Sequence, residues 1–156
     1  MNDNTLPTIE TLVSRFPLTC LTISQPYASL IASGETWVEN RSWMTPYRGP
    51  LGIHAGQGTQ YLTRSEMQNY PTKQIVAVAY MAGCINLKRA VDNVTSELVI
   101  LKQLGITRGE LLMHEHTEGP WCWILQRVRP CVPVPFSGSQ GLWLLRNPPA
   151  TQSARG

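Results

Sequence analysis

The 156-residue chain has few charged residues, no clustered cysteines and no long apolar run. Charged side chains make up 15% of the chain and hydrophobic ones 42%, a balance that excludes an intrinsically disordered polymer. The apolar runs fall short of the roughly 20 residues that a membrane-spanning helix needs. The first residues are polar and lack the basic and apolar regions of a signal peptide. These absences together predict a globular, cytoplasmic protein.

The four cysteines are scattered and form no Cys-x-x-Cys pair. Because no Cys/His cluster has zinc-finger spacing, we expect reduced thiols, no metal site and no cofactor. His114 and His116, with Glu115 and Glu118, form a His-Glu-His-x-x-Glu pattern. It matches no established zinc motif, and we interpret it as an exposed polar loop.

The positive charge of the chain is small but carried mostly by arginine. The formal charge is +3, and ten arginines stand against three lysines. A non-specific duplex binder usually has a denser basic footprint. Arginine binds phosphate bidentately and stacks on flat rings, so with five Trp and five Tyr this composition suits recognition of unpaired bases. GC-biased codon usage would give the same ratio of arginine to lysine.

Twelve glycines and twelve prolines favour short strands and tight turns over a helix bundle. Hydrophobic alternation predicts strands at 18–23, 36–43, 51–56, 75–87, 121–134 and 141–145. Helices are predicted at 24–34, 59–69 and 97–104, and a long loop or insertion continues to 118. This order predicts an α+β fold, mainly β: a curved or closed mixed β-barrel with one or two helices on its rim. We expect one domain at 17–147, a leader at 1–16 and a disordered tail at 148–156.

The helix predicted at 24–34 has clear start and stop signals. Ser24 can cap its amino end, and Gly34 stands where a C′ glycine belongs. The amino end of a helix favours anions, so Ser24 and Gln25 become candidate contacts for a phosphate or a base.

The strand at 36–43 carries an unusual face. Alternation puts Trp37, Glu39, Arg41 and Trp43 on one side. The functional interpretation is a cleft in which Arg41 and Glu39 contact a nucleotide and Trp43 stacks on a base. The structural alternative is an ion pair under the barrel rim with core tryptophans, and for Trp37 we favour the core.

Residues 18–56 resemble the ASCH family, a branch of the PUA-like superfamily. The resemblance begins at Ser24-Gln25-Pro26-Tyr27-Ala28 and continues through 34–41, Gly-Glu-Thr-Trp-Val-Glu-Asn-Arg, which is similar to the family signature G-x-K-x-x-E-x-R. The later strands through Gly83 and Gly141 extend the match over most of 18–146. The resemblance implies a PUA-like β-barrel that holds nucleic acid, RNA above all, in a cleft.

The signature departs from the family pattern at one important place. Hydrolases that resemble this family remove the acetyl group of acetylcytidine with a Lys, a Thr and a Glu. Thr36 and Trp37 stand where the Lys and Thr belong, whereas Glu39 and Arg41 are retained. The resemblance therefore favours a binding module over an enzyme.

The predicted nucleic-acid contacts are Ser24, Gln25, Glu39, Arg41, Trp43 and Arg48. The alternative is a hydrolase, a ribonuclease or an acetylcytidine amidohydrolase, that uses Glu39 and His54 in the same cleft. A third class stays open: a nucleotide sensor or a protein-interaction adaptor without affinity for nucleic acid.

Overall fold

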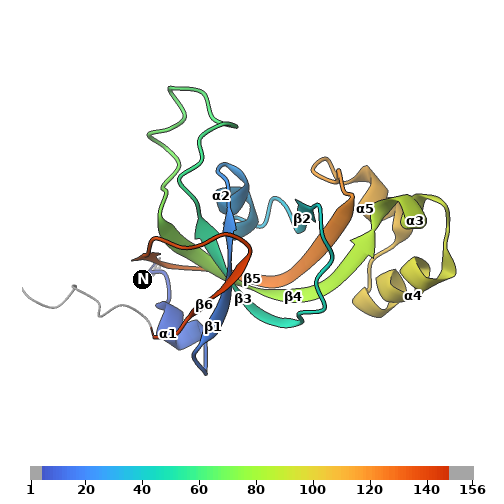
Figure 1. Cartoon of the computed structure of the whole chain (residues 1–156), viewed down its shortest axis with the longest axis horizontal. Coiled ribbons are helices and arrows are strands. Elements are labelled where there is room, and N and C mark those ends of the chain that lie inside the picture. The colour runs from blue at the N-terminus through green and yellow to red at the C-terminus, as the bar shows by residue number, and fades with distance from the viewer. Residues whose placement is uncertain (1–4, 148–156) are drawn as a thin grey trace, which may run out of the picture. The chain divides into compact units, whose positions relative to one another are not determined.

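The computed structural model describes residues 5–147. Its strands are β1 (Leu18–Ile23), β2 (Val38–Arg41), β3 (Gly49–Ala55), β4 (Gln74–Asn86), β5 (Trp121–Pro135) and β6 (Leu142–Leu145), shown in Figure 1. Its helices are α1 (Ile9–Leu12), α2 (Tyr27–Ala32), α3 (Leu87–Val91), α4 (Thr95–Leu104) and α5 (Arg108–Met113). All six predicted strands are present, with ends that shift by a few residues.

The strands follow the order β2-β5-β4-β3-β1-β6 in one mixed sheet. β1 pairs parallel with β3 and antiparallel with β6, and β2 pairs antiparallel with β5. The predicted class, α+β with a mainly β mixed sheet, is confirmed.

The chain separates into two compact units. The first unit contains the described residues of the ranges 1–35, 50–79 and 128–156, and the second contains 36–49 and 80–127. The boundary falls inside β4 and β5, so each of these strands contributes residues to both units.

The core of the first unit is built from β-strand residues and from the segment before β1. Ile9 of α1 and nearby Val13 are 1% and 6% exposed and belong to one buried cluster with Leu18 and Ile75. Residues 9–13, expected to belong to a leader, therefore contribute to this core. Because β1 alternates, Leu18 and Cys20 point into the same cluster.

The core of the second unit lies between its strands and three helices. Val38 of β2 and Ile124 of β5 are buried with Ala90, Leu101 and Leu111, which come from α3, α4 and α5 respectively. These helices therefore cover one face of the β2–β5 ribbon.

Two stretches between the strands differ from expectation. Residues 59–69 form turns, not the predicted helix, and the Glu66 carboxylate accepts the backbone N–H of Thr63. The segment is polar and has no apolar stripe to bury, so packing cannot stabilise a helix there. Conversely, α5 lies within the predicted loop. The Thr107 hydroxyl caps this helix by accepting the backbone N–H of Glu110, and it donates to the Glu110 carboxylate.

All four cysteines are buried. Within residues 5–147, none of the helices combines the length and the apolar character that a membrane-spanning segment requires.

Candidate nucleic-acid interface

Four of the candidate side chains are organised by the register of the β2–β5 ribbon. Glu39 pairs with Trp123 and Arg41 with Trp121 across the two antiparallel strands. Directly opposed residues point to the same side, so these four share one face. Val38 and Ile124 point to the other face, which the helices cover. We call the face that carries Glu39, Arg41, Trp121, Trp123 and the adjoining Trp43 the aromatic face.

Trp43 follows β2 and is held in place by Trp123. The two ring centroids lie 4.7 Å apart with planes at 89°, and the indole N–H of Trp123 donates to the carbonyl oxygen of Trp43 at 3.1 Å. Trp123 is completely buried, whereas Trp43 is 37% exposed. A buried indole thus fixes an exposed one, which reduces the entropy that Trp43 loses when a ligand stacks on it.

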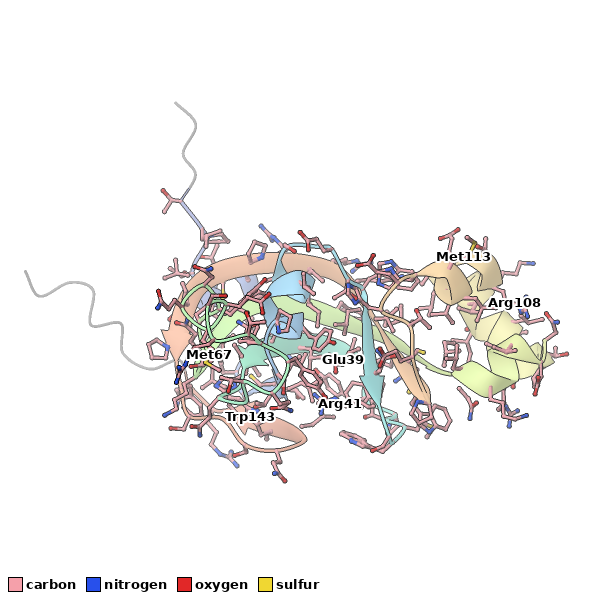
Figure 2. The ribbon with its side chains drawn as sticks, turned by 90° about the horizontal axis from the view of Figure 1, so that it is seen from above. Glu39, Arg41, Met67, Arg108, Met113 and Trp143 are labelled. Carbon is pink, nitrogen blue, oxygen red and sulfur yellow. The ribbon has the colours of Figure 1, made fainter. Side chains whose placement is uncertain are left out.

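Glu39 and Arg41 form an ion pair on this face. Arg41 Nε lies 3.4 Å from Glu39 Oε1, and the two side chains are only 21% and 12% exposed respectively; Figure 2 shows them side by side on β2. Burial raises the pKa of Glu39 to about 7, although the positive charge of Arg41 acts in the opposite direction. Near neutral pH the carboxyl is close to its titration midpoint, so it neutralises Arg41 only in part.

Arg48 supplies a second cation in the same unit. Its Nη1 donates to the carbonyl oxygens of Thr45 at 2.9 Å and Tyr47 at 2.8 Å. The side chain is exposed, as expected for a turn residue. Because its partners are carbonyls, the guanidinium is positioned without being neutralised.

Thr36 and Trp37, which replace the Lys and Thr of the family signature, have structural contacts. Thr36 is 1% exposed, donates to the carbonyl of Val38 and lies 3.0 Å from His114 Nε2. The Trp37 ring lies 4.8 Å from the ring of His114 and packs against the buried cluster that contains Val38. Trp37 therefore does not share the side of Glu39, contrary to the alternation argument, because β2 begins only at Val38.

Asn40, on the helix-covered side of β2, holds the histidine-containing loop. Its Oδ1 accepts the backbone N–H groups of Glu118 and Gly119, and its Nδ2 donates to the carbonyl of His116 at 2.7 Å. Among residues 5–147, no group of three or more His, Cys, Asp or Glu side chains is arranged to hold a metal ion.

Ser24 and Gln25 lie in the first unit, at the start of α2. Pro26 occupies the N-cap position without a side-chain hydrogen bond, so the predicted capping by Ser24 is wrong. Gln25 is completely buried; its Oε1 accepts the backbone N–H of Ser29, and its Nε2 donates to the carbonyl of Pro71. The side chain of Gln25 instead caps this end of α2, through the backbone N–H of Ser29.

His54 also belongs to the first unit and is completely buried. Nε2 lies 2.6 Å from the carbonyl oxygen of Phe136, and Nδ1 lies 3.1 Å from Thr22 Oγ1. Since a carbonyl can only accept, Nε2 carries the proton and Nδ1 accepts. Burial lowers the pKa of His54, which keeps the ring neutral near pH 7.

The structure thus brings together part of the predicted set. Glu39, Arg41, Trp43 and Arg48 lie in the second unit, whereas Ser24, Gln25 and His54 lie in the first. The support that Trp123 gives to Trp43 does not follow from the sequence. Only the pairing register of β2 with β5 could have revealed it.

The family model described as "ASCH domain" matches residues 21–131. The chain belongs to the ASCH domain family.

Two curated relatives share a shorter stretch. The protein is 36% identical over 78 residues to activating signal cointegrator 1 of Homo sapiens and, equally, to that of Mus musculus. Each match covers 42% of this chain and 12% of the relative. Among solved structures, an ASCH protein from Zymomonas mobilis is similar with a TM-score of 0.48 and 20% identity, over 83% of this chain and 88% of that one.

Proposed function

We propose that the aromatic face binds single-stranded nucleic acid, and that RNA is the ligand. The observation that carries this proposal is the half-exposed Trp43, fixed by the buried Trp123, on the face that also carries Arg41. Stacking of an unpaired base on such a ring contributes about 1–3 kcal/mol. Membership of the ASCH family supports the same interpretation.

Each charged candidate has a distinct role in this proposal. Arg41 contacts a phosphate or the edge of a base, and Glu39 orients the guanidinium or accepts a hydrogen bond from a base amine. Arg48 binds a further phosphate. Ser24 stays a predicted contact at α2. Gln25, whose amide is fully engaged within the protein, we assign to positioning α2.

The test is a titration of the full chain with fluorescein-labelled single-stranded RNA and DNA of the same sequence, followed by fluorescence anisotropy at two salt concentrations. We expect binding that weakens with salt and is tighter for RNA. Flat titrations with both nucleic acids would remove the proposal, and equal affinities would remove RNA as the preferred ligand.

Variants then locate the interface. Trp43→Ala should weaken binding about tenfold, because it removes one stacking surface. Met44→Ala is the matched control, since Met44 is the next residue and is 54% exposed. Arg41→Lys keeps the charge beside Glu39 but loses the guanidinium. Arg64→Lys makes the same exchange at an exposed arginine outside the aromatic face and is its control. Melting curves establish that each variant is folded.

A hydrolase is the second candidate, favoured by the pKa of Glu39 near 7, which suits a general base at neutral pH. Ribonuclease activity and deacetylation of acetylcytidine are assayed in the same mixtures. On this proposal Glu39→Gln abolishes product formation, while binding of single-stranded RNA persists. His54 is a poorer candidate for the second catalytic residue, because Thr22 and the carbonyl of Phe136 already occupy both of its ring nitrogens. Absence of product in all wild-type mixtures would exclude these two reactions.

A further inference from the structure

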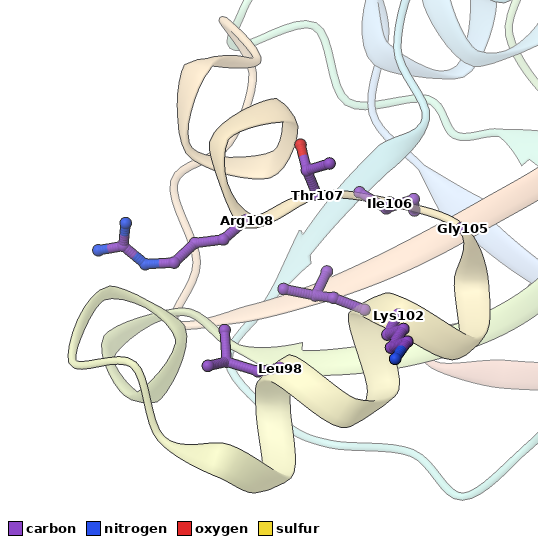
Figure 3. A pocket seen from close by; sticks show the side chains of 7 residues that line it. Leu98, Lys102, Gly105, Ile106, Thr107 and Arg108 are labelled. Carbon is purple, nitrogen blue, oxygen red and sulfur yellow. The ribbon is translucent and has the colours of Figure 1, made fainter.

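A pocket of about 350 Å³ opens on the helical part of the second unit, away from the residues of the aromatic face in sequence (Figure 3). Leu98, Leu101 and Ile106 give it an apolar lining, and Lys102 and Arg108 add two cations. Its size lies at the lower end of ligand pockets in proteins, which suits a single large side chain better than a cofactor.

The turn between α4 and α5 creates this pocket. Gly105 ends α4 in the left-handed region at φ 72°, a conformation that favours glycine. The backbone N–H of Ile106 then donates to the carbonyl of Leu101, and Thr107 caps α5. Hydrogen bonds therefore fix both borders of the apolar lining, which exists before any ligand arrives.

The acidic side chains of these helices have partners other than Lys102 and Arg108. Asp92 pairs with Lys88 at 2.9 Å and Glu97 with Arg89 at 3.3 Å. Glu110 accepts the hydroxyl of Thr107 at 3.1 Å. Glu110 therefore lies next to the pocket through Thr107, which lines it, but none of these carboxylates forms an ion pair with Lys102 or Arg108.

Arg108 and Lys102 are presented differently. Arg108 donates Nε to the carbonyl of Ala90 at 2.8 Å and Nη2 to that of Val91 at 2.7 Å, so its guanidinium is held rigidly. Lys102 is exposed. In the ion pairs of residues 5–147, neither cation faces a carboxylate. A fixed and a mobile positive charge beside an apolar lining are complementary to an anionic, amphipathic ligand.

Two further large apolar side chains are exposed on the same group of helices. Val91 at the end of α3 is 46% exposed, and Met113 at the end of α5 is 86% exposed. Figure 2 shows Arg108 and Met113 on the same group of helices. An exposed methionine on these helices favours a protein partner, because its flexible thioether adapts to different side chains.

We propose that this pocket docks an acidic segment of a protein partner, which inserts one large apolar side chain against Leu98 and Ile106 and sets carboxylates against Lys102 and Arg108. The lining contains no aromatic ring on which a base could stack, so single-stranded nucleic acid is the poorer match. The proposal is independent of the function assigned to the aromatic face.

The test uses two fluorescein-labelled peptides and the full chain. One peptide carries a central Leu-Trp pair flanked by Asp and Glu, and the other has Asn and Gln at the flanking positions. Fluorescence anisotropy at low ionic strength should show binding of the acidic peptide only. Amide chemical-shift changes in an NMR spectrum should centre on Gly105 and Ile106.

The chain offers matched controls for each part of the pocket. Lys102→Gln and Gln103→Glu both lower the net charge by one, but only Lys102 lines the pocket. We expect Lys102→Gln to weaken binding of the acidic peptide about fivefold, which is the upper end for an exposed charge pair. Gln103→Glu should have little effect. Leu98→Asn should weaken binding of the acidic peptide about tenfold. Val99→Asn, on the same helix, is its control.

Three outcomes would overturn the proposal. The first is equal affinity of the two peptides. The second is that Lys102→Gln changes the affinity for the acidic peptide no more than Gln103→Glu does. The third is that the chemical-shift changes centre on Glu39 and Arg41. In the last case the peptide competes with single-stranded RNA, and the acidic probe is acting as a mimic of the nucleic acid. Loss of RNA binding in Trp43→Ala would leave the peptide result unchanged, so the two proposals fail separately.

Discussion

At the scale of single residues, Glu39 is the most unusual group in the second unit. Its carboxyl is desolvated on a β-strand, and one arginine compensates only part of the cost of its charge. The protein therefore keeps an acid that titrates near neutral pH at the centre of the candidate interface. Groups with such shifted pKa values cluster at functional sites more often than chance allows.

The raised pKa of Glu39 predicts a pH-dependent stability. The unfolded chain has a Glu pKa near 4.5 and the folded protein one of about 7, so the folded state binds the extra proton between these values. Its contribution is fully present below pH 4.5 and is lost as pH rises towards 7. Each pKa unit corresponds to about 1.4 kcal/mol, so the loss of folding stability reaches about 3 kcal/mol.

Glu39→Gln removes this titration. The free energy of unfolding of the variant, minus that of the wild type, should rise between pH 4.5 and 7 and level off above. Urea denaturation of both proteins at several pH values measures this difference. The subtraction removes the contribution of the histidine titrations, which both proteins share. A difference that stays flat with pH would show that the pKa of Glu39 is not raised.

The same group predicts a pH-dependent affinity. Above pH 7 the Glu39 carboxylate competes with phosphate for Arg41 and repels it. Affinity for single-stranded RNA should therefore increase several-fold as pH falls from 8 to 6. Glu39→Gln should bind at pH 8 as the wild type does at pH 6, without pH dependence. Anisotropy titrations decide this, and an unchanged pH profile in the variant would assign the effect to another group.

At the scale of elements, the short β2 strand organises the second unit through both its faces. Glu39 and Arg41 face the aromatic side, whereas Asn40 fastens residues 116–119 with three hydrogen bonds. A strand of four residues has little packing area of its own, so these bonds and the β5 register keep it in place.

Asn40→Ala should destabilise the protein by about 2–3 kcal/mol, at about 1 kcal/mol for each hydrogen bond lost. Asn40→Asp keeps the acceptor for Glu118 and Gly119 and loses the donor to His116, so it should cost less. Denaturation curves rank the two variants. If Asn40→Ala is as stable as the wild type, this loop does not hold β2.

At the scale of the whole molecule, the net charge of +3 limits how strongly electrostatics can drive nucleic-acid binding. The proposed interface has two phosphate-binding arginines, Arg41 and Arg48. Stacking, which is insensitive to salt, must then supply much of the affinity.

Two phosphate contacts predict a slope of about −1.4 when the logarithm of the RNA-binding constant is plotted against that of salt concentration, at about −0.7 for each contact on a single strand. Anisotropy titrations from low to moderate salt measure the slope. Arg48→Ala should reduce its magnitude by about half. A much steeper slope would indicate a broad basic surface instead of two defined contacts.

The sequence by itself determined the six strands, the α+β class and the family. Strand alternation is local, and Gly34 at φ 83° ends α2 where predicted, because glycine tolerates that conformation. Spacing along one strand also sufficed to place Glu39 and Arg41 together.

Only the tertiary structure decided which strands and side chains meet. Trp123 and Trp43 are 80 residues apart in the sequence. The register of β2 with β5 brings the buried indole of Trp123 into contact with the exposed indole of Trp43. Burial likewise raises the pKa of Glu39. Hydrogen bonds to distant residues occupy the side chains of Gln25 and His54, and Trp37 packs against the ring of His114. Desolvation and long-range hydrogen bonding depend on the neighbours in space, which a single sequence does not specify.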